Sequence, residues 1–294
     1  MTLELNDGWK HKVASYYRTS TEESYLKWAG DALALHLGYS DDDAPITERA
    51  ALDRALLKMN AWLADRANIT RDTVVLDAGC GVGGSSIWLA LERGADVTGI
   101  TLDAGQVALA RKFAAERRAE SARFEARDFE ATGFAPSSFD VVWNLESLCH
   151  APSPAAYAAH VAQILKPGGR FACVDFFRTG HAPDVDVEAM CEGWVLPSLQ
   201  TVEEAAKTLR DAGFEAVETE VITARVMPSA TVMGQIGLQE CVRHRLALAR
   251  GATSDARLDA HFRASLAAAS GLGRGAITYA YVGARRPSIT RVDT

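Results

Sequence analysis

Short apolar runs alternate with longer segments of helical periodicity over most of the chain. β-branched and aromatic residues fill the short runs, whereas the longer segments place apolar residues at every third or fourth position. This alternation predicts a parallel sheet with helices on both faces, which is a doubly wound α/β fold. Strands are expected at 74–77, 96–101, 122–126, 141–144, 170–176, 215–226 and 276–284, and core helices at 85–93, 104–118, 154–165 and 202–212.

Two segments lie outside this alternation. Residues 9–38 carry aromatic side chains at roughly helical spacing, and they form either a helix that packs on the core or a lid over an active site. Residues 227–275 are too long for a hairpin loop, which predicts a helical insertion that forms a wall of the substrate pocket. The expected units are an N-terminal helical lid at 1–45, a core at 46–226, the insertion at 227–275, and the last core strand and tail at 276–294.

Composition narrows the choice of partners. The 294 residues carry a net charge of −7 without a long basic run, so a nucleic-acid partner has little electrostatic support. No run of about 18 apolar residues occurs, which argues against membrane insertion. The five cysteines are scattered and the seven histidines form no short ligand pattern, so neither disulfides nor a metal site is expected. We expect a soluble, cytoplasmic protein with a small-molecule substrate; a homo-oligomer is compatible with the sequence.

The most informative stretch follows the first expected strand. Gly79, Gly81 and Gly84 form a turn between that strand and a helix, an arrangement that brings backbone close to a ligand. Their spacing also fits the G-x-G-x-x-G pattern of dinucleotide-binding folds, so an NAD-dependent oxidoreductase is an alternative. Asp77 favours a different ligand, because its carboxylate would repel a pyrophosphate and attract the ammonium of an amino-acid moiety.

The run Val75-Leu76-Asp77-Ala78-Gly79-Cys80-Gly81 resembles the first motif of class I S-adenosylmethionine (SAM) methyltransferases. The resemblance implies a Rossmann-like sheet of seven strands whose last strand is antiparallel. It also implies an enzyme that uses SAM as its cofactor, with glycines that admit SAM and with Asp77 holding its methionine end.

The ends of the second and third expected strands resemble a narrower group. The run from Gly99 to Gln106 is similar to the Gly-x-Thr-Leu-x-x-x-Gln pattern of the tocopherol and mycolate enzymes, although it lacks the acid that most class I methyltransferases place at this strand tip. The resemblance implies that Thr101 and Gln106 contact the ribose and that Ile100 lies beside the adenine. Asp128 is expected to accept from the adenine amino group; its alternative role is to cap the following turn.

The N-terminal segment adds one cofactor contact. Ser15-Tyr16-Tyr17-Arg18-Thr19 resembles the segment that closes over the active site in sterol and tocopherol C-methyltransferases, where a tyrosine contacts the SAM carboxylate. Tyr17 is the expected counterpart, with Tyr16 as the neighbouring candidate. The full set of expected cofactor contacts is Tyr17, Asp77, Gly79, Gly81, Ile100, Thr101, Gln106, Asp128, Phe129 and Asn144.

The fourth expected strand ends in a run that bears on the chemistry. Residues 146–152 resemble the acid-x-x-x-His-Ala-Pro run of sterol C-methyltransferases, and Glu146 and His150 share a face if they begin a helical turn. Methylation of an alkene carbon needs an in-line approach, stabilisation of a carbocation and a base. Glu146 or His150 can be that base. Glu146 has the alternative of a helix-terminal or cofactor-orienting acid, and His150 that of a structural hydrogen bond.

The expected acceptor site is aromatic. The run Gly193-Trp194-Val195-Leu196-Pro197 resembles a substrate-lining run of the tocopherol enzymes. The expected catalytic residues are Glu146, His150 and Tyr17, and the expected substrate residues are Tyr16, Trp28, Phe176, Trp194 and Leu196.

These resemblances imply C-methylation of an isoprenoid or terpenoid alkene, a small apolar natural product. O- or N-methylation of another secondary metabolite is an alternative, because one fold hosts several reactions. A further alternative is a protein that keeps SAM as a structural element and catalyses a cyclisation. Mg²⁺ is expected only if the acceptor is a diphosphate, for which the sequence offers no evident Arg or Lys cluster.

Overall fold

The computed structural model describes residues 2–251 and 256–288. Seven strands form one sheet in the order β3-β2-β1-β4-β5-β7-β6, and β7 runs antiparallel to both of its neighbours. The Rossmann-like arrangement with an antiparallel last strand is therefore confirmed. The strands are β1 (Val74–Ala78), β2 (Asp96–Thr101), β3 (Ala122–Ala126), β4 (Phe139–Leu145), β5 (Leu165–Arg178), β6 (Glu215–Val221) and β7 (Ile277–Arg285).

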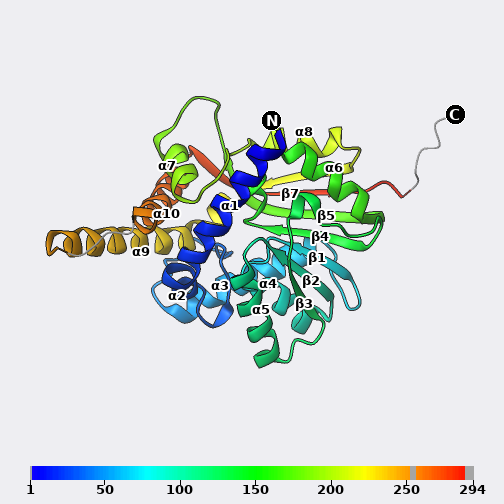
Figure 1. Cartoon of the computed structure of the whole chain (residues 1–294), viewed down its shortest axis with the longest axis horizontal. Coiled ribbons are helices and arrows are strands. Elements are labelled where there is room, and N and C mark those ends of the chain that lie inside the picture. The colour runs from blue at the N-terminus through cyan, green and yellow to red at the C-terminus, as the bar shows by residue number, and fades with distance from the viewer. Residues whose placement is uncertain (1, 252–255, 289–294) are drawn as a thin grey trace.

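Helices cover both faces of the sheet (Figure 1). Strand periodicity explains the two layers, because consecutive residues of β1 face opposite sides: Val75 belongs to one apolar cluster and Leu76 to the other. The first cluster is completed by α3 (Arg49–Arg66), α4 (Gly84–Trp88) and α5 (Ala104–Arg117), and the second by α6 (Pro154–Ile164) and α8 (Val202–Asp211). Chain order reverses between β1 and β4, so their adjacent carboxyl ends form the crevice where such sheets bind ligands.

The N-terminal segment lies over this crevice. It consists of α1 (Thr2–Ser20), a π-helical turn (Thr21–Tyr25), α2 (Leu26–Ala29) and a 3₁₀ turn (Gly30–Ala32), followed by an irregular stretch up to α3. That stretch passes so close to the glycine turn that a β-carbon added to Gly84 would lie 2.1 Å from the carbonyl oxygen of Leu33. The third glycine of the motif thus allows the N-terminal segment to pack on the core.

The insertion begins earlier than the sequence indicates. Residues 222–226 were expected to extend the sixth strand, but β6 ends at Val221 and α9 (Thr223–Ala249) begins immediately. Val226 and Ala230 are both fully buried and lie four residues apart, so the apolar run follows a helical period. Helix α10 (Ala256–Arg274) packs beside α9 and beside α7 (Val185–Gly193), a helix that the sequence pattern did not predict.

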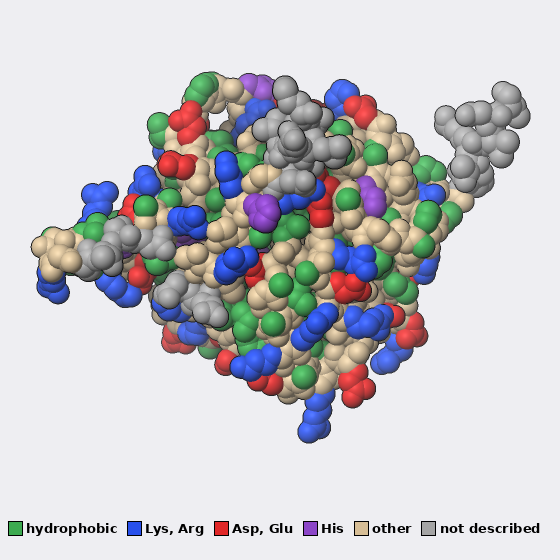
Figure 2. Space-filling model, viewed as in Figure 1, with side chains coloured by type: hydrophobic (Ala, Val, Ile, Leu, Met, Phe, Trp, Pro, Cys, Tyr) green, Lys and Arg blue, Asp and Glu red, His purple; other side chains and the backbone are tan. Residues whose placement is uncertain are grey.

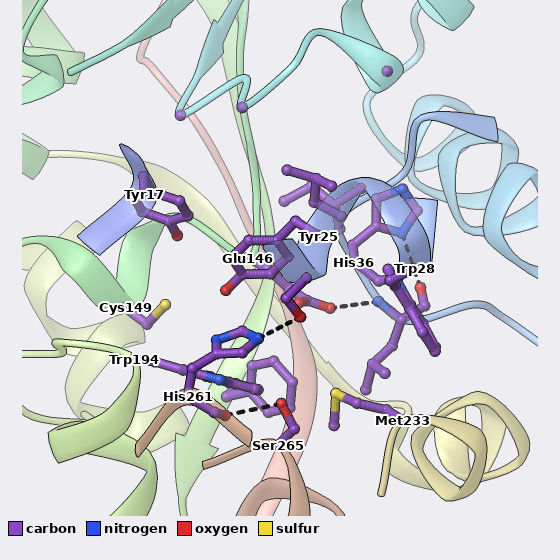
Figure 3. A pocket seen from close by; sticks show the side chains of 18 of the residues that line it. Tyr17, Tyr25, Trp28, His36, Glu146, Cys149, Trp194, Met233, His261 and Ser265 are labelled. Atoms are coloured by element: carbon purple, nitrogen blue, oxygen red, sulfur yellow. Dashed lines mark hydrogen bonds between the residues drawn. The ribbon is translucent and has the colours of Figure 1, made fainter. Parts of the chain in front are cut away.

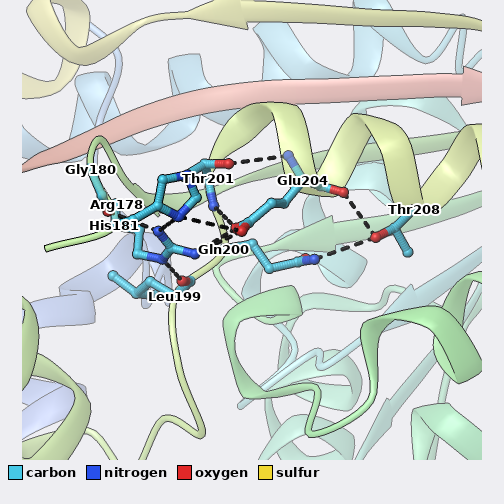
Figure 4. Close-up of polar contacts among 8 residues, drawn as sticks. All are labelled: Arg178, Gly180, His181, Leu199, Gln200, Thr201, Glu204 and Thr208. Carbon is cyan, nitrogen blue, oxygen red and sulfur yellow. Dashed lines mark hydrogen bonds and ion pairs between the residues drawn. The ribbon is translucent and has the colours of Figure 1, made fainter.

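The chain between β5 and α8 is held by Arg178 (Figure 4). Its guanidinium donates to the carbonyl of Leu199 at 2.6 Å and to both carboxylate oxygens of Glu204 at 2.8 Å. Glu204 also completes a capping box with Thr201 at the start of α8. These bonds fix the two ends of the segment that carries α7 and Trp194.

The surface has mixed charge. Acidic and basic side chains are interspersed over the face that carries α1 (Figure 2). None of the described helices combines the length and the apolar character that crossing a bilayer requires.

Candidate active site

The glycine turn after β1 has the backbone shape of a ligand-binding loop. Gly79 and Gly81 have φ angles of +98° and +53°, a region that residues with side chains rarely adopt. A β-carbon added to Gly79 would also lie 2.4 Å from Cβ of Ser147. The amide groups of Gly79 and Cys80 both donate to the carbonyl of Ile100 at 2.9 Å. The turn is therefore a fixed stretch of bare backbone at the carboxyl end of β1.

Asp77 lies on β1, just before this turn. The residue is 3% exposed, and its Oδ2 accepts a hydrogen bond from Ser86 Oγ at 2.6 Å. Burial raises the pKa of Asp77 to about 6, and hydrogen bonds from Ser86 act in the opposite direction. At neutral pH the carboxyl is mostly ionised, so it can pair with a buried ammonium group.

A first cavity, here called the loop cavity, is lined by the glycine turn, α1 and the segments that follow β2 and β3. It brings together residues that the sequence predicts for the cofactor. These are Tyr17, Gly79, Gly81, Thr101, Gln106, Asp128 and Phe129.

The N-terminal segment supplies hydrogen-bond and ion-pair partners inside the loop cavity. Gln106 Nε2 donates to Thr21 Oγ1 at 3.1 Å, and Lys10 pairs with Asp128 at 2.6 Å. Asp128 also accepts from the amide of Glu130 at 2.9 Å, so it does cap the turn after β3. A ligand that bonded to Gln106 or Asp128 would have to replace, or share with, these partners from the N-terminal segment.

A second cavity, here called the central cavity, has a volume of about 110 Å³ and lies between the glycine turn, the N-terminal segment and α9 and α10 (Figure 3). Asp77, Trp28, Phe176 and Trp194 line it, together with residues that also line the loop cavity. The shared residues are Tyr17, Gly79, Gly81, Glu146 and His150. Because Asp77 lines the central cavity, a cofactor that pairs with Asp77 would extend from the loop cavity past these shared residues, and an acceptor would take the rest of the central cavity.

Positive charge is absent from the described lining of the central cavity, which contains no lysine and no arginine. Three histidines line it: His36, His150 and His261. Burial lowers the pKa of each to about 4, so all three are neutral at pH 7. The cavity therefore suits an uncharged or cationic guest better than an anion.

Glu146 projects into the centre of this cavity (Figure 3). Its φ angle of +53° turns the chain at the end of β4. Its Oε1 accepts two hydrogen bonds, from the amide of Leu37 at 2.7 Å and from the hydroxyl of Tyr279 at 2.6 Å. Burial raises the pKa of Glu146 to about 8, although both hydrogen bonds act to lower it. The carboxyl is thus largely protonated at pH 7 in the absence of ligands and, once ionised, is a stronger base than an ordinary carboxylate.

His150 lies in the 3₁₀ turn Leu148–His150 rather than on a regular helix with Glu146. Its Nε2 lies 2.7 Å from the hydroxyl of Tyr17. This bond links the N-terminal segment to the segment after β4. It is a hydrogen bond of the structural kind that the sequence analysis gave as the alternative role of His150. Its catalytic role stays a prediction.

Four of the expected site residues line neither cavity. Ile100 is fully buried in the sheet, and Leu196 packs in the core. Asn144 is also fully buried, and its side chain bonds to the carbonyl of Ala78, to Ser147 and to Tyr157. Tyr16 lies behind the cavity wall, where its hydroxyl bonds to Tyr25 and His261. These side chains find their partners within the protein, so they support the site from outside.

Several residues of the site were not predicted. Tyr25, Met233 and His261 line the central cavity, and Tyr279 holds Glu146 without lining it. Tyr25 belongs to the aromatic segment that the sequence singled out. Tyr279 lies 133 residues from Glu146 in a strand that is buried over most of its length, so no local pattern marks it.

Comparison with known proteins gives the family. A family model described as a methyltransferase domain matches residues 76–173. The 2-methyl-6-phytyl-1,4-hydroquinone methyltransferase of Synechocystis sp. is 31% identical over 223 residues, which are 72% of this chain and 67% of that protein. The O-methyltransferase cnsE of Penicillium expansum is 30% identical over 206 residues, which are 69% of this chain and 73% of that protein. The chain belongs to the class I SAM-dependent methyltransferases.

Solved structures agree on the fold of this methyltransferase. The [4+2]-cyclase SpnF superposes with a TM-score of 0.76 at 24% identity and covers 94% of this chain and 95% of its own. The geranyl diphosphate C-methyltransferase of Streptomyces coelicolor superposes with a TM-score of 0.75 at 19% identity and covers 95% and 98%. Proteins that share this architecture therefore include both a methyltransferase and a cyclase.

The residues at the two cavities fit SAM. Asp77 offers a buried carboxylate for an ammonium group, and the backbone at Gly79 and Gly81 leaves no side chain in the way. Gln106 and Asp128 offer hydrogen-bonding groups in the loop cavity. When bound, SAM would supply an electrophilic methyl group on a sulfonium.

Substitutions should separate cofactor binding from turnover. We expect Asp77→Ala to weaken SAM binding by at least about tenfold, since a buried counter-ion is lost. Gly81→Val should abolish binding, because valine is strained at φ +53° and its β-carbon would lie 2.9 Å from Leu35. Glu146→Gln should leave SAM affinity nearly unchanged and slow turnover. Isothermal titration with SAM, on variants whose thermal melting shows that they fold, measures the affinities; an equal loss in all three would assign Glu146 to cofactor binding instead.

Proposed function

We propose that this methyltransferase transfers the methyl group of SAM to an alkene carbon of an uncharged isoprenoid-type natural product, and that Glu146 removes the proton. The observation that carries the proposal is a carboxyl group, with its pKa raised to about 8, at the centre of a cavity with aromatic walls and no lysine or arginine in its described lining. Carbon methylation needs this combination, because the reaction creates a positive charge and then requires a base.

The charge distribution supports a neutral acceptor. Burying a diphosphate costs a large desolvation energy unless cations or metal ions compensate for it. The described lining of the central cavity has no Lys or Arg, and the described residues include no cluster of three or more side chains that would hold a metal. The geranyl diphosphate enzyme was crystallised with Mg²⁺ and a diphosphate analogue. Mg²⁺ is not part of the function proposed for the present chain.

The reaction proceeds in two steps at the boundary of the cavities. A carbon–carbon bond forms to the methyl group as its bond to sulfur breaks, and the adjacent acceptor carbon becomes positive. The rings of Tyr25, Trp28, Phe176 and Trp194 line the space around that carbon and stabilise it through cation–π attraction of about 0.5–2 kcal/mol per well-placed ring. A proton then leaves the acceptor, and its bonding electrons form the new double bond.

Glu146 is arranged to take that proton. Both of its hydrogen bonds end on Oε1, which leaves Oε2 as the oxygen available to the acceptor. A positive charge nearby lowers the pKa of Glu146 and favours its ionised form. The fraction of enzyme with an ionised Glu146 therefore limits the rate, and the cationic acceptor favours the charged form of the base until the proton is transferred.

O-methylation is the second candidate, because a relative at 30% identity is an O-methyltransferase. The two reactions differ in what the acceptor must carry. O-methylation requires a hydroxyl group, whereas carbon methylation requires only the alkene. Acceptors without any O–H or N–H group therefore distinguish them.

An acceptor panel tests the proposed function. Geranyl and farnesyl methyl ethers carry alkenes but no O–H or N–H group, and we expect them to be methylated, with formation of S-adenosylhomocysteine measured by mass spectrometry. The corresponding prenyl diphosphates should react at least about tenfold more slowly with or without Mg²⁺, because the cavity gives the diphosphate no counter-charge. Methylation of a phenol of similar size but not of the ethers would favour O-methylation, and preference for a diphosphate would contradict the neutral acceptor.

The raised pKa of Glu146 predicts the pH dependence. A group of pKa about 8 is about 10% ionised at pH 7 and about 90% at pH 9, so kcat/KM should rise roughly ninefold between them. The Tyr279 hydroxyl lowers this pKa, so Tyr279→Phe should move the midpoint to higher pH. Phe keeps the ring in the core and serves as the conservative change. A flat profile between pH 6.5 and 9.5, or an unmoved midpoint in Tyr279→Phe, would remove Glu146 as the base.

A further inference from the structure

A groove on the outside of the molecule shares one lining residue with the central cavity. This groove, here called the α9 groove, has a volume of about 790 Å³, against about 110 Å³ for the central cavity. Residues 43–49 and Leu52 form one side and residues 224–236 of α9 form the other. Ile236 lines both the groove and the central cavity. One side chain on α9 thus separates the reacting centre from a much larger space.

One small apolar cluster lies between residues of the two spaces. Trp28 lines the central cavity, whereas Ile46 and Val232 line the α9 groove. All three side chains pack on one small cluster, formed by Ala32, Ala34, Leu52 and Leu56. Figure 3 shows Trp28 and Met233 on the same side of the cavity, with Met233 on α9 next to the residues of the groove. Arg49, which lines the groove, also donates to the carbonyl oxygen of Trp28 at 2.5 Å, so the wall between the two spaces contains one polar contact beside its apolar packing.

The α9 groove is lined by more apolar than polar residues, and its polar ones are Asp43, Thr47, Glu48, Arg49, Thr231 and Gln235. Ile46, Leu52, Met227, Pro228, Val232 and Ile236 contribute most of the apolar side chains that line it. Its one lysine or arginine among the described lining residues is Arg49, whose guanidinium lies 2.6 Å from Asp53. The groove therefore offers contact to hydrocarbon and no uncompensated positive charge to an anionic ligand.

We propose that the α9 groove binds the hydrocarbon tail of the acceptor while the reacting alkene lies in the central cavity, with the chain passing Ile236. This inference rests on the proposed function and extends it, because it assigns the acceptor a tail longer than the central cavity holds. The position of Ile236 between the two spaces and the apolar residues of the groove favour hydrocarbon as the occupant. Affinity should then grow with chain length, because each further isoprene unit buries apolar surface in the groove.

Binding of uncharged probes of increasing length tests the groove. The probes are geranyl, farnesyl and geranylgeranyl methyl ethers, titrated into the protein saturated with S-adenosylhomocysteine and followed by tryptophan fluorescence. The unmodified protein should bind each longer ether roughly tenfold more tightly than the one before. Thr231→Trp and Val232→Trp fill the groove at two residues that do not line the central cavity, so they should remove the gain for the two longer ethers and leave affinity for the geranyl ether within about twofold.

Leu246→Trp is the matched control, because Leu246 is an exposed apolar residue of the same helix and lines neither space. It should keep the full chain-length dependence. Two groove variants guard against one that misfolds, and thermal melting checks both. The proposal that the groove binds the tail is wrong if the chain-length dependence persists in both folded variants, or if the unmodified protein shows none. Methyl transfer is measured separately. Chain-length-dependent binding without methylation would support the groove and contradict the proposed function. Methylation that is insensitive to both variants would support the proposed function and contradict the groove.

Discussion

The arrangement of the site depends on one buried carboxyl group. Removing Glu146 from water disfavours its charged form, and two donors from distant parts of the chain, the amide of Leu37 and the hydroxyl of Tyr279, compensate only in part. The N-terminal segment, the end of β4 and the last strand therefore meet at one oxygen atom. An arriving positive charge supplies the missing compensation, which links the ionisation of this carboxyl to the presence of ligands.

Hydrogen bonds between the helical insertion and the N-terminal segment close the cavity. His261 of α10 bonds to Tyr16 through Nδ1 and to Ser24 through Nε2, each at 2.8 Å. Ser229 of α9 bonds to the amide and the carbonyl of Gly38. The insertion thus holds the N-terminal segment over the crevice, and this enclosure removes water from the acidic group and from the aromatic walls.

Local patterns predicted most of the sheet and the glycine turn. The expected second and third strands match β2 and β3 residue for residue, because alternation and flanking turns define short strands well. The run after Val221 was ambiguous between strand and helix, and burial of Val226 against the core decided for helix. Chain position also placed Glu146 and Asp77 at cavities, since residues that end parallel strands share one edge of a sheet.

Contacts between residues that lie far apart in the sequence could not be predicted from these local patterns. Tyr279 and His261 come from ordinary apolar elements, and only the packing of the last strand and the insertion brings them to the site. Asn144 and Ile100 do lie near the ends of their strands, as expected, but their side chains are buried in the core. Side-chain direction at a strand tip depends on local backbone angles, which sequence spacing does not specify.

The most direct test of the account is the structure of the product. The protein is incubated with SAM labelled with ¹³C in its methyl group and with farnesyl methyl ether, and the product is examined by NMR. The account predicts a labelled methyl group bonded to carbon and a new or shifted double bond, formed more slowly by Glu146→Gln. A label retained on SAM beside an isomer of the acceptor, as in a cyclisation, or no reaction with this ether while a hydroxylated acceptor takes the label on oxygen, would contradict it.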